Sequence, residues 1–170
     1  MERKGTKIYL YLPEGEDLPV EKQWVVDHDY PVNIAKIAKE TGCKQLHIIS
    51  SAGANAASKF YYMRMKGQME ADVKEVGLPR VTIYRPAFLV CDRQESRLGE
   101  RIMALPISLY SKLCPTTASV PTTTVAKAML LSSAPDSAAG GETGAFQIIE
   151  NPQIHALGAE FDKKYNQAAE

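Results

Sequence analysis

Residues that build metal centres and disulfide frameworks are scarce in this sequence. The 170 residues include three cysteines, which lie far apart and form no CxxC pair: Cys43, Cys91 and Cys114. They also include three histidines without the spacing of metal ligands: His28, His47 and His155. We therefore expect no structural metal site. The isolated cysteines indicate a reducing compartment such as the cytoplasm.

An excess of one charge and long hydrophobic runs are missing too. Lysine plus arginine number 20, aspartate plus glutamate number 20, and the two signs are interleaved. The basic face that favours nucleic-acid binding is therefore not expected. The longest apolar runs are far shorter than the roughly 20 residues of a membrane-spanning helix, and the N-terminus shows no signal-peptide pattern. The length suits one domain with a sizeable core.

Strand patterns alternate with helix patterns along the chain. Hydrophobic periodicity and turn residues predict strands at residues 7–12, 44–50, 80–86 and 145–150. They predict helices at residues 24–42, 59–76, 121–133 and 151–167. Residues 88–100 are predicted to form a charged loop, residues 101–115 are helix-prone, and residues 137–144 are predicted to form a flexible loop. This order indicates an α/β fold in which helices cover a parallel sheet.

The helix patterns also predict which side chains face the core. The first helix is expected to begin near Trp24 with Pro31 in an early turn, and to bury a stripe of Ile34, Ile37 and Ala38. The second is expected to bury Met65, Met69 and Val73.

Three further side chains are expected to have structural roles. His47 alternates within a strand and is expected to pack in the core. His28 lies between Asp27 and Asp29, which suggests either a pH-sensitive group or a solvated helix start, and we favour the latter. Cys91 fits a half-buried structural thiol better than a reactive one.

Polar residues follow two of the predicted strands. Ligands of parallel α/β sheets bind beyond the carboxyl ends of the strands, where Ser50, Ser51, Arg85 and Pro86 fall. A serine hydroxyl there could hydrogen-bond a substrate carbonyl. The alternative is that residues 50–58 form a plain polar loop.

A tyrosine and a lysine follow on the second helix. Tyr62 and Lys66 are four residues apart and therefore share a helix face. An ammonium group beside a phenol favours the phenolate, and such a tyrosine can exchange a proton with an alcohol or a forming alkoxide. Because both residue types are common, an aromatic–lysine pair on a solvated helix face explains the spacing equally well.

The ordered combination of strand, Ser-Ser, Tyr-x-x-x-Lys and a strand ending in Arg-Pro resembles the extended or atypical short-chain dehydrogenase/reductase superfamily. The segments "FYYMRMKGQMEADV", "YRPAFLVCDRQESRLGE" and "SVPTTTVAKAML" resemble the Tat-interactive protein family of oxidoreductase-like proteins. "CDRQESR" is specific to that family, and the match spans roughly residues 24 to 158. The resemblance implies a Rossmann-like fold with helices on both faces of the sheet, and an NAD(P)H-dependent oxidoreductase that favours NADP(H) over NAD(H).

The resemblance also implies roles for individual residues. Tyr62 would be the proton donor and acceptor, and Lys66 would lower the pKa of that tyrosine and bind the nicotinamide ribose. Ser51, or its neighbour Ser50, would orient the substrate carbonyl. Arg85 and Pro86 would lie in the loop beside the nicotinamide. Asp27, where extended members often carry asparagine, would help to order the site.

The glycine-rich turn that binds the cofactor phosphates in this superfamily is missing. The only clustered glycines, in "AAGGETGAFQII" (residues 138–149), precede a strand instead of following one and opening a helix. We therefore expect residues 24–170 to be the C-terminal part of a single Rossmann-like domain that is truncated at its N-terminus. Residues 1–23 are expected to be an unmatched segment with one short strand.

That missing turn leaves a non-catalytic role open as the alternative. The family's regulatory roles lie in nuclear import, transcription, apoptosis and endosomal trafficking. For this chain they imply importin-type transport receptors or other regulatory proteins as partners. They also imply a homodimer as one arrangement and a location in the cytoplasm, the nucleus or the nuclear envelope.

Overall fold

A four-stranded parallel sheet forms the centre of the fold. The structure, a computed structural model, describes residues 7–10, 20–90, 118–134 and 145–166. In these residues the sheet has the strand order β1-β2-β3-β6, and each neighbouring pair is parallel. Its strands are β1 Lys7–Leu10, β2 Gln45–Ile49, β3 Arg80–Arg85 and β6 Ala145–Glu150. The N-terminal segment therefore contributes a strand to the same sheet as the rest of the chain.

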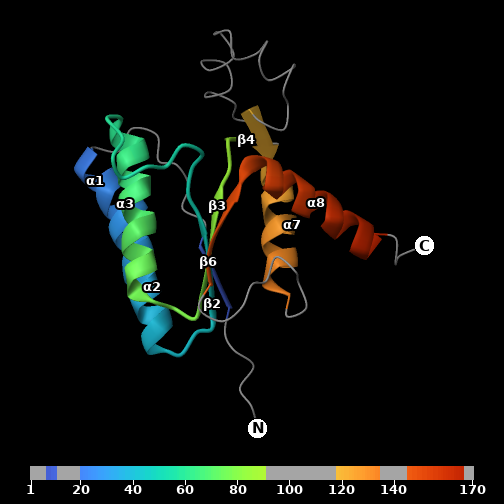
Figure 1. Ribbon diagram of the computed structural model, residues 1–170, viewed down its shortest axis with the longest axis horizontal. Helices are drawn as coiled ribbons and strands as arrows, with labels where there is room; N and C mark the ends of the chain where they lie inside the picture. Colours follow the sequence, from blue (N-terminus) through green and yellow to red (C-terminus); the bar gives the residue numbers. More distant parts are fainter. Residues whose placement is uncertain (1–6, 11–19, 91–117, 135–144, 167–170) are drawn as a thin grey trace.

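Helices cover both faces of this sheet, with α2 and α3 on one face and α7 and α8 on the other (Figure 1). The helices are α1 Val20–Trp24, η1 Val25–Asp29, α2 Tyr30–Glu40, α3 Tyr61–Val76, α7 Thr122–Ser133 and α8 Asn151–Asn166. The α/β architecture expected from the sequence is confirmed.

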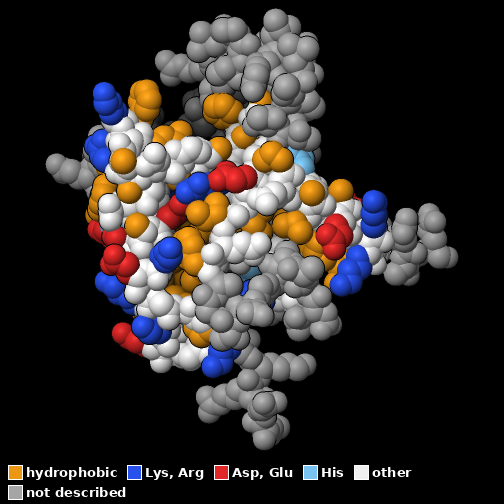
Figure 2. Space-filling model, viewed as in Figure 1, with side chains coloured by type: hydrophobic (Ala, Val, Ile, Leu, Met, Phe, Trp, Pro, Cys, Tyr) orange, Lys and Arg blue, Asp and Glu red, His pale blue; other side chains and the backbone are white. Residues whose placement is uncertain are grey.

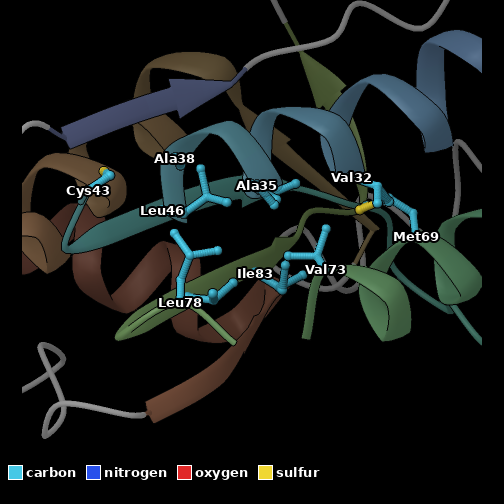
Figure 3. Packing of buried hydrophobic residues seen from close by; sticks show 11 residues of the cluster. Val32, Ala35, Ala38, Cys43, Leu46, Met69, Val73, Leu78 and Ile83 are labelled. Atoms are coloured by element: carbon cyan, nitrogen blue, oxygen red, sulfur yellow. The ribbon is translucent and has the colours of Figure 1, made fainter. Parts of the chain in front are cut away.

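The hydrophobic core beneath α2 and α3 joins the two helices to β2 and β3. Figure 3 shows side chains of α2 and α3 meeting those of the strands, among them Leu46 and Ile83. Met65, Met69 and Val73 are each 0% exposed, as the helical spacing predicted. This packing fixes α3 against β2 and β3.

The first helical segment differs from its prediction. It begins at Val20 and passes through the π-helical turn η1 before α2. Pro31 has no N–H and cannot continue the α-helical hydrogen-bond ladder, and the wider π turn lies immediately before it. The expected stripe is also partly wrong, because Ile37 is 55% exposed while Val32, Ala35 and Ala38 are buried. Helix α2 therefore presents a different face to the sheet than the sequence predicted, one formed by residues three positions apart.

A second, smaller sheet lies beyond the end of β3. Strand β4, Phe88–Val90, pairs in parallel with β5, Ser119–Pro121, so the charged loop expected from residue 88 onwards is wrong for these three residues. Asn151 Oδ1 accepts a hydrogen bond of 2.9 Å from the N–H of Ala87. This bond fastens the start of α8 to the turn between β3 and β4. Cys91, the helix-prone segment 101–115 and the predicted loop 137–144 lie outside the described residues.

Charged side chains of both signs are interspersed on the face of the molecule shown in Figure 2. Within the described residues, no helix is both long enough and apolar enough to cross a membrane. The same residues contain no cluster of three or more His, Cys, Asp or Glu side chains that could hold a metal ion.

Candidate functional site

The two serines lie where β2 leaves the sheet. The N–H of Ser50 donates a 2.7 Å hydrogen bond to the carbonyl of Tyr84, and Ala52 N–H donates one of 2.9 Å to the carbonyl of Pro86. The segments that follow β2 and β3 are therefore tied side by side. Ser50 is 5% exposed, and its Oγ has no hydrogen-bond partner within the described part of the chain. A buried hydroxyl without a partner costs free energy, and the Thr82 hydroxyl within β3 shares this state.

Ser51 is the other candidate for hydrogen-bonding a substrate oxygen. It is only partly buried, and its hydroxyl donates a long 3.4 Å hydrogen bond to the carbonyl of Ala52. Both serines stay candidates for hydrogen-bonding a substrate oxygen.

The loop after the serines packs directly on α3 at Gly67. A Cβ atom at Gly67 would lie 2.1 Å from the backbone N of Ala56 and 2.3 Å from the carbonyl carbon of Asn55. Only a residue without a side chain permits this approach. The contact therefore fixes the loop that follows the serines against α3, one residue beyond Lys66 in the chain.

Replacing Gly67 with alanine is therefore expected to destabilise the fold by about 1–3 kcal/mol, the usual cost of overpacking. Helix propensity alone would predict the opposite sign, a gain of about 1 kcal/mol. The free energy of urea unfolding decides between the two. Ala71→Gly, at an exposed position of the same helix, calibrates the propensity. A Gly67→Ala variant more stable than the parent would show that the loop does not pack here.

Tyr62 and Lys66 lie together on α3, as their spacing predicted. The Lys66 Nζ is 5.7 Å from the centre of the Tyr62 ring. Lys66 is 3% exposed, and its ammonium donates a 2.7 Å hydrogen bond to Oδ1 of Asp27, which is 1% exposed. The buried lysine is therefore paired with a residue of the π-helical turn η1, and the ordering role expected for Asp27 stays a prediction.

The adjacent Tyr61 is a poor candidate for the same chemistry. Burial raises the pKa of Tyr61, and the negative charge of Asp27 raises it further against the opposing effect of Arg64. These effects make the Tyr61 hydroxyl a weaker acid than an ordinary tyrosine. Of the two consecutive tyrosines, Tyr62 is the one beside the lysine ammonium.

Arg85 is engaged by carboxylates at the end of β3. Its Nη2 and Nε lie 2.6 Å and 3.0 Å from the two carboxylate oxygens of Glu70, and Nη1 lies 2.9 Å from Glu150. The hydrogen bonds that Arg85 donates to Glu70, and after them the one that it donates to Glu150, raise the pKa of Arg85 against the lowering effect of burial. The guanidinium thus ties β3 to α3 and β6. Roles of Arg85 and the buried Pro86 toward a cofactor stay predictions.

His28 is not at a solvated helix start, contrary to the expectation from the sequence. It is 7% exposed. Its Nδ1 lies 2.8 Å from Asp29 and its Nε2 lies 2.9 Å from Asp72 of α3. The ring stacks on Trp24 at a centroid distance of 4.5 Å. Asp72 is 44 residues away in the chain, so no local pattern could reveal the pair. His47, by contrast, is 0% exposed, as expected.

Comparison with known proteins finds relatives over most of the chain. No family model matches. The chain is 38% identical to Protein HTATIP2 of Rattus norvegicus over 142 residues, 81% of this chain and 54% of that protein. It is 42% identical to the mitochondrial protein fmp52 of Aspergillus fumigatus over 93 residues, 55% of this chain and 40% of that protein. The chain thus spans about half the length of the curated relatives it matches, or less.

Solved structures share the fold. The enzyme WbmG of Bordetella bronchiseptica, in complex with NAD and UDP, matches with a TM-score of 0.56 and 17% identity, over 96% of this chain and 56% of that one. DesIV of Streptomyces venezuelae, a dTDP-glucose 4,6-dehydratase with NAD and DAU bound, matches with a TM-score of 0.53 and 13% identity, over 94% and 57%. At such identities the likeness establishes the Rossmann-like fold alone.

Proposed function

Because this chain is a homologue of HTATIP2 with the Rossmann-like fold of the short-chain dehydrogenase/reductase superfamily, we propose that it carries the acid–base half of a nicotinamide-dependent oxidoreductase. The observation that carries the proposal is the site itself. Tyr62 lies beside a buried lysine that is held by a buried carboxylate. Ser50, at the end of β2, supplies a buried hydroxyl that has no hydrogen-bond partner within the described residues. A chance pair on a solvated helix face would have left Lys66 exposed to water.

The residues of this site fit the nicotinamide end of the cofactor. An ammonium group has three donor hydrogens, and Asp27 accepts one from Lys66, which leaves donors for ribose hydroxyls. The structures of WbmG and DesIV hold NAD, and family resemblance favours NADP(H) for this chain, with NAD(H) as the alternative. The bound nicotinamide supplies or accepts the hydride. Arg85 and Pro86 would border it through the backbone that follows β3.

The chain's own side chains would handle the proton. The Tyr62 hydroxyl donates its proton to the oxygen of a carbonyl being reduced, or accepts one from an alcohol being oxidised. The positive charge of Lys66 stabilises the resulting phenolate, while Asp27 holds that ammonium in place. The hydroxyl of Ser50, or of Ser51, hydrogen-bonds the substrate oxygen and keeps it near Tyr62.

Titration with NADPH tests the proposed function. A full-length version, including any residues that the gene encodes before Met1, is expected to bind NADPH and to melt at a higher temperature. Ligand at one hundred times its Kd stabilises a folded protein by about 2.7 kcal/mol. NADH titrated in parallel tests the preference between the cofactors. A full-length protein whose melting temperature neither nucleotide changes would contradict the proposal.

A second candidate function is a regulatory interaction protein without catalysis. It is favoured by the sequence of this chain, in which no glycine-rich turn follows a strand and opens a helix. On this proposal the protein binds importin-type transport receptors or other regulatory proteins, in processes such as nuclear import, transcription, apoptosis or trafficking. It acts in the cytoplasm or at the nucleus, as a monomer or a homodimer, although the fungal relatives are named mitochondrial.

Binding measurements and turnover together separate the two functions. A purified importin-type receptor that binds the protein, combined with no NADPH oxidation by the full-length version, would favour the regulatory role. Turnover without binding of such a receptor would favour the enzyme.

A further inference from the structure

His28 is a buried titratable side chain that the proposed proton exchange does not use. It occupies the same π-helical turn as Asp27, and this turn packs against α3. Its two ring nitrogens face two carboxylates, Asp29 on its own segment and Asp72 on α3. An ionised carboxylate only accepts hydrogen bonds. Both ring nitrogens of His28 therefore lie within hydrogen-bond distance of an acceptor oxygen.

The surroundings hold this imidazole in one orientation. Gln68 Nε2 donates a 2.8 Å hydrogen bond to Oδ1 of Asp72, so the carboxylate is fixed while its other oxygen faces His28. Trp24 stacks on one face of the His28 ring. The ring centre of Tyr61, on α3, lies 6.4 Å from that of Trp24. The His28 ring is thus bound at both nitrogens and covered on one face.

Consecutive residues of η1 therefore make two separate ties to α3. Asp27 binds Lys66, and His28 binds Asp72, which lies on the same helix. A π-helical turn has no strong intrinsic preference to form, so its geometry depends on such side-chain ties. Within the described residues, loss of the His28–Asp72 hydrogen bond would leave the Asp27–Lys66 pair as the side-chain hydrogen bond that joins Asp27 and His28 to α3.

We infer that His28 is a positioning residue of the acid–base site: its hydrogen bonds to Asp72 and Asp29 fix the turn that presents Asp27 to Lys66. The inference rests on the proposed function for its catalytic consequence. Its structural part, the protection of the Lys66 ammonium, can be measured without any cofactor. The sole tryptophan of the chain, Trp24, stacks on His28 and reports the same geometry by fluorescence.

The experiment measures how fast each lysine of the whole 170-residue chain reacts with an amine-directed acylating reagent, by mass spectrometry. His28→Phe keeps a ring to stack on Trp24 but removes both ring nitrogens. We expect it to speed labelling of Lys66 by roughly ten- to a hundredfold, the factor that corresponds to losing one charge-assisted hydrogen bond. Asp72→Asn, at a partly exposed position, should act in the same direction and serves if His28→Phe fails to fold.

Two controls separate a positioning role from general loosening. Lys127, paired with Asp162 between α7 and α8, should label at an unchanged rate in both variants. His28→Arg, which can donate to both carboxylates, should restore slow labelling of Lys66 and the parent's Trp24 emission. Lys66 labelling that stays slow in both His28→Phe and Asp72→Asn would overturn the inference, as would an equal acceleration at Lys127.

Kinetics distinguish this inference from the proposed function. If the full-length parent oxidises NADPH, His28→Phe should raise the KM for NADPH more than it lowers kcat, because Lys66 would hold the ribose less well. Equal KM and kcat in parent and variant would overturn the inference while the proposed function stands. A parent without turnover, whose Lys66 still becomes reactive in His28→Phe, would contradict the proposed function and support the structural tie.

Discussion

Tyr62→Phe is expected to lower the turnover of the full-length protein by about 10²–10⁴-fold, the usual contribution of a positioned acid–base group. The substitution removes one hydroxyl and leaves the ring beside Lys66 in place. NADPH affinity should change little, because the lysine and its carboxylate partner remain. Steady-state NADPH oxidation, with the carbonyl compound that the parent reduces fastest, gives kcat, and fluorescence titration gives the Kd.

Tyr61→Phe is the matched control for this prediction. The two tyrosines are adjacent on α3, and each variant loses the same hydroxyl. Because Tyr62, and not Tyr61, is the tyrosine beside the Lys66 ammonium, the Tyr61→Phe variant should retain the parent's turnover. A Tyr62→Phe variant as active as Tyr61→Phe would show that the proton passes through another group.

Asp27→Leu is expected to lower the free energy of unfolding by about 3–5 kcal/mol, because it leaves the Lys66 ammonium buried without its partner. Both side chains are almost fully buried, at 1% and 3% exposure, and their charged atoms are 2.7 Å apart. An ordinary surface ion pair would contribute only about 0–1 kcal/mol. Urea unfolding followed by circular dichroism measures the difference.

The double variant Asp27→Leu with Lys66→Met tests the cause of that loss. Replacing a buried ion pair with apolar residues of similar volume is often neutral or stabilising, so the double variant should recover most of the lost stability. It should also lose NADPH binding, since the ammonium is gone. A double variant as unstable as the sum of both single variants would show that the two side chains act independently.

Local patterns predicted those features of the fold that depend on neighbours in the sequence. The strands β2, β3 and β6 follow from apolar runs bounded by turn residues, and α3 follows from the spacing of Met65, Met69 and Val73. The pairing of Tyr62 with Lys66 was predictable for the same reason, since residues four apart on a helix share a face. Helical periodicity was less reliable in α2, because the preceding π turn shifts which residues of the helix face the sheet.

Contacts between distant segments could not be predicted in this way. The approach of Asn55 and Ala56 to Gly67 depends on how the loop after β2 crosses α3. The two carboxylates that bind Arg85 come from α3 and from the end of β6. A charge run such as Asp27-His28-Asp29 suggests solvated side chains until a partner such as Asp72 is known.

The sequence by itself determined the alternation of strands and helices, the buried face of α3, and the placement of tyrosine and lysine on one helix, because these follow from backbone periodicity. Only the tertiary structure decided that Lys66 is buried against Asp27, that the buried Ser50 hydroxyl has no partner among the described residues, and that His28 bridges to α3. The environment of a polar group depends on side chains that the fold brings together from far apart in the chain.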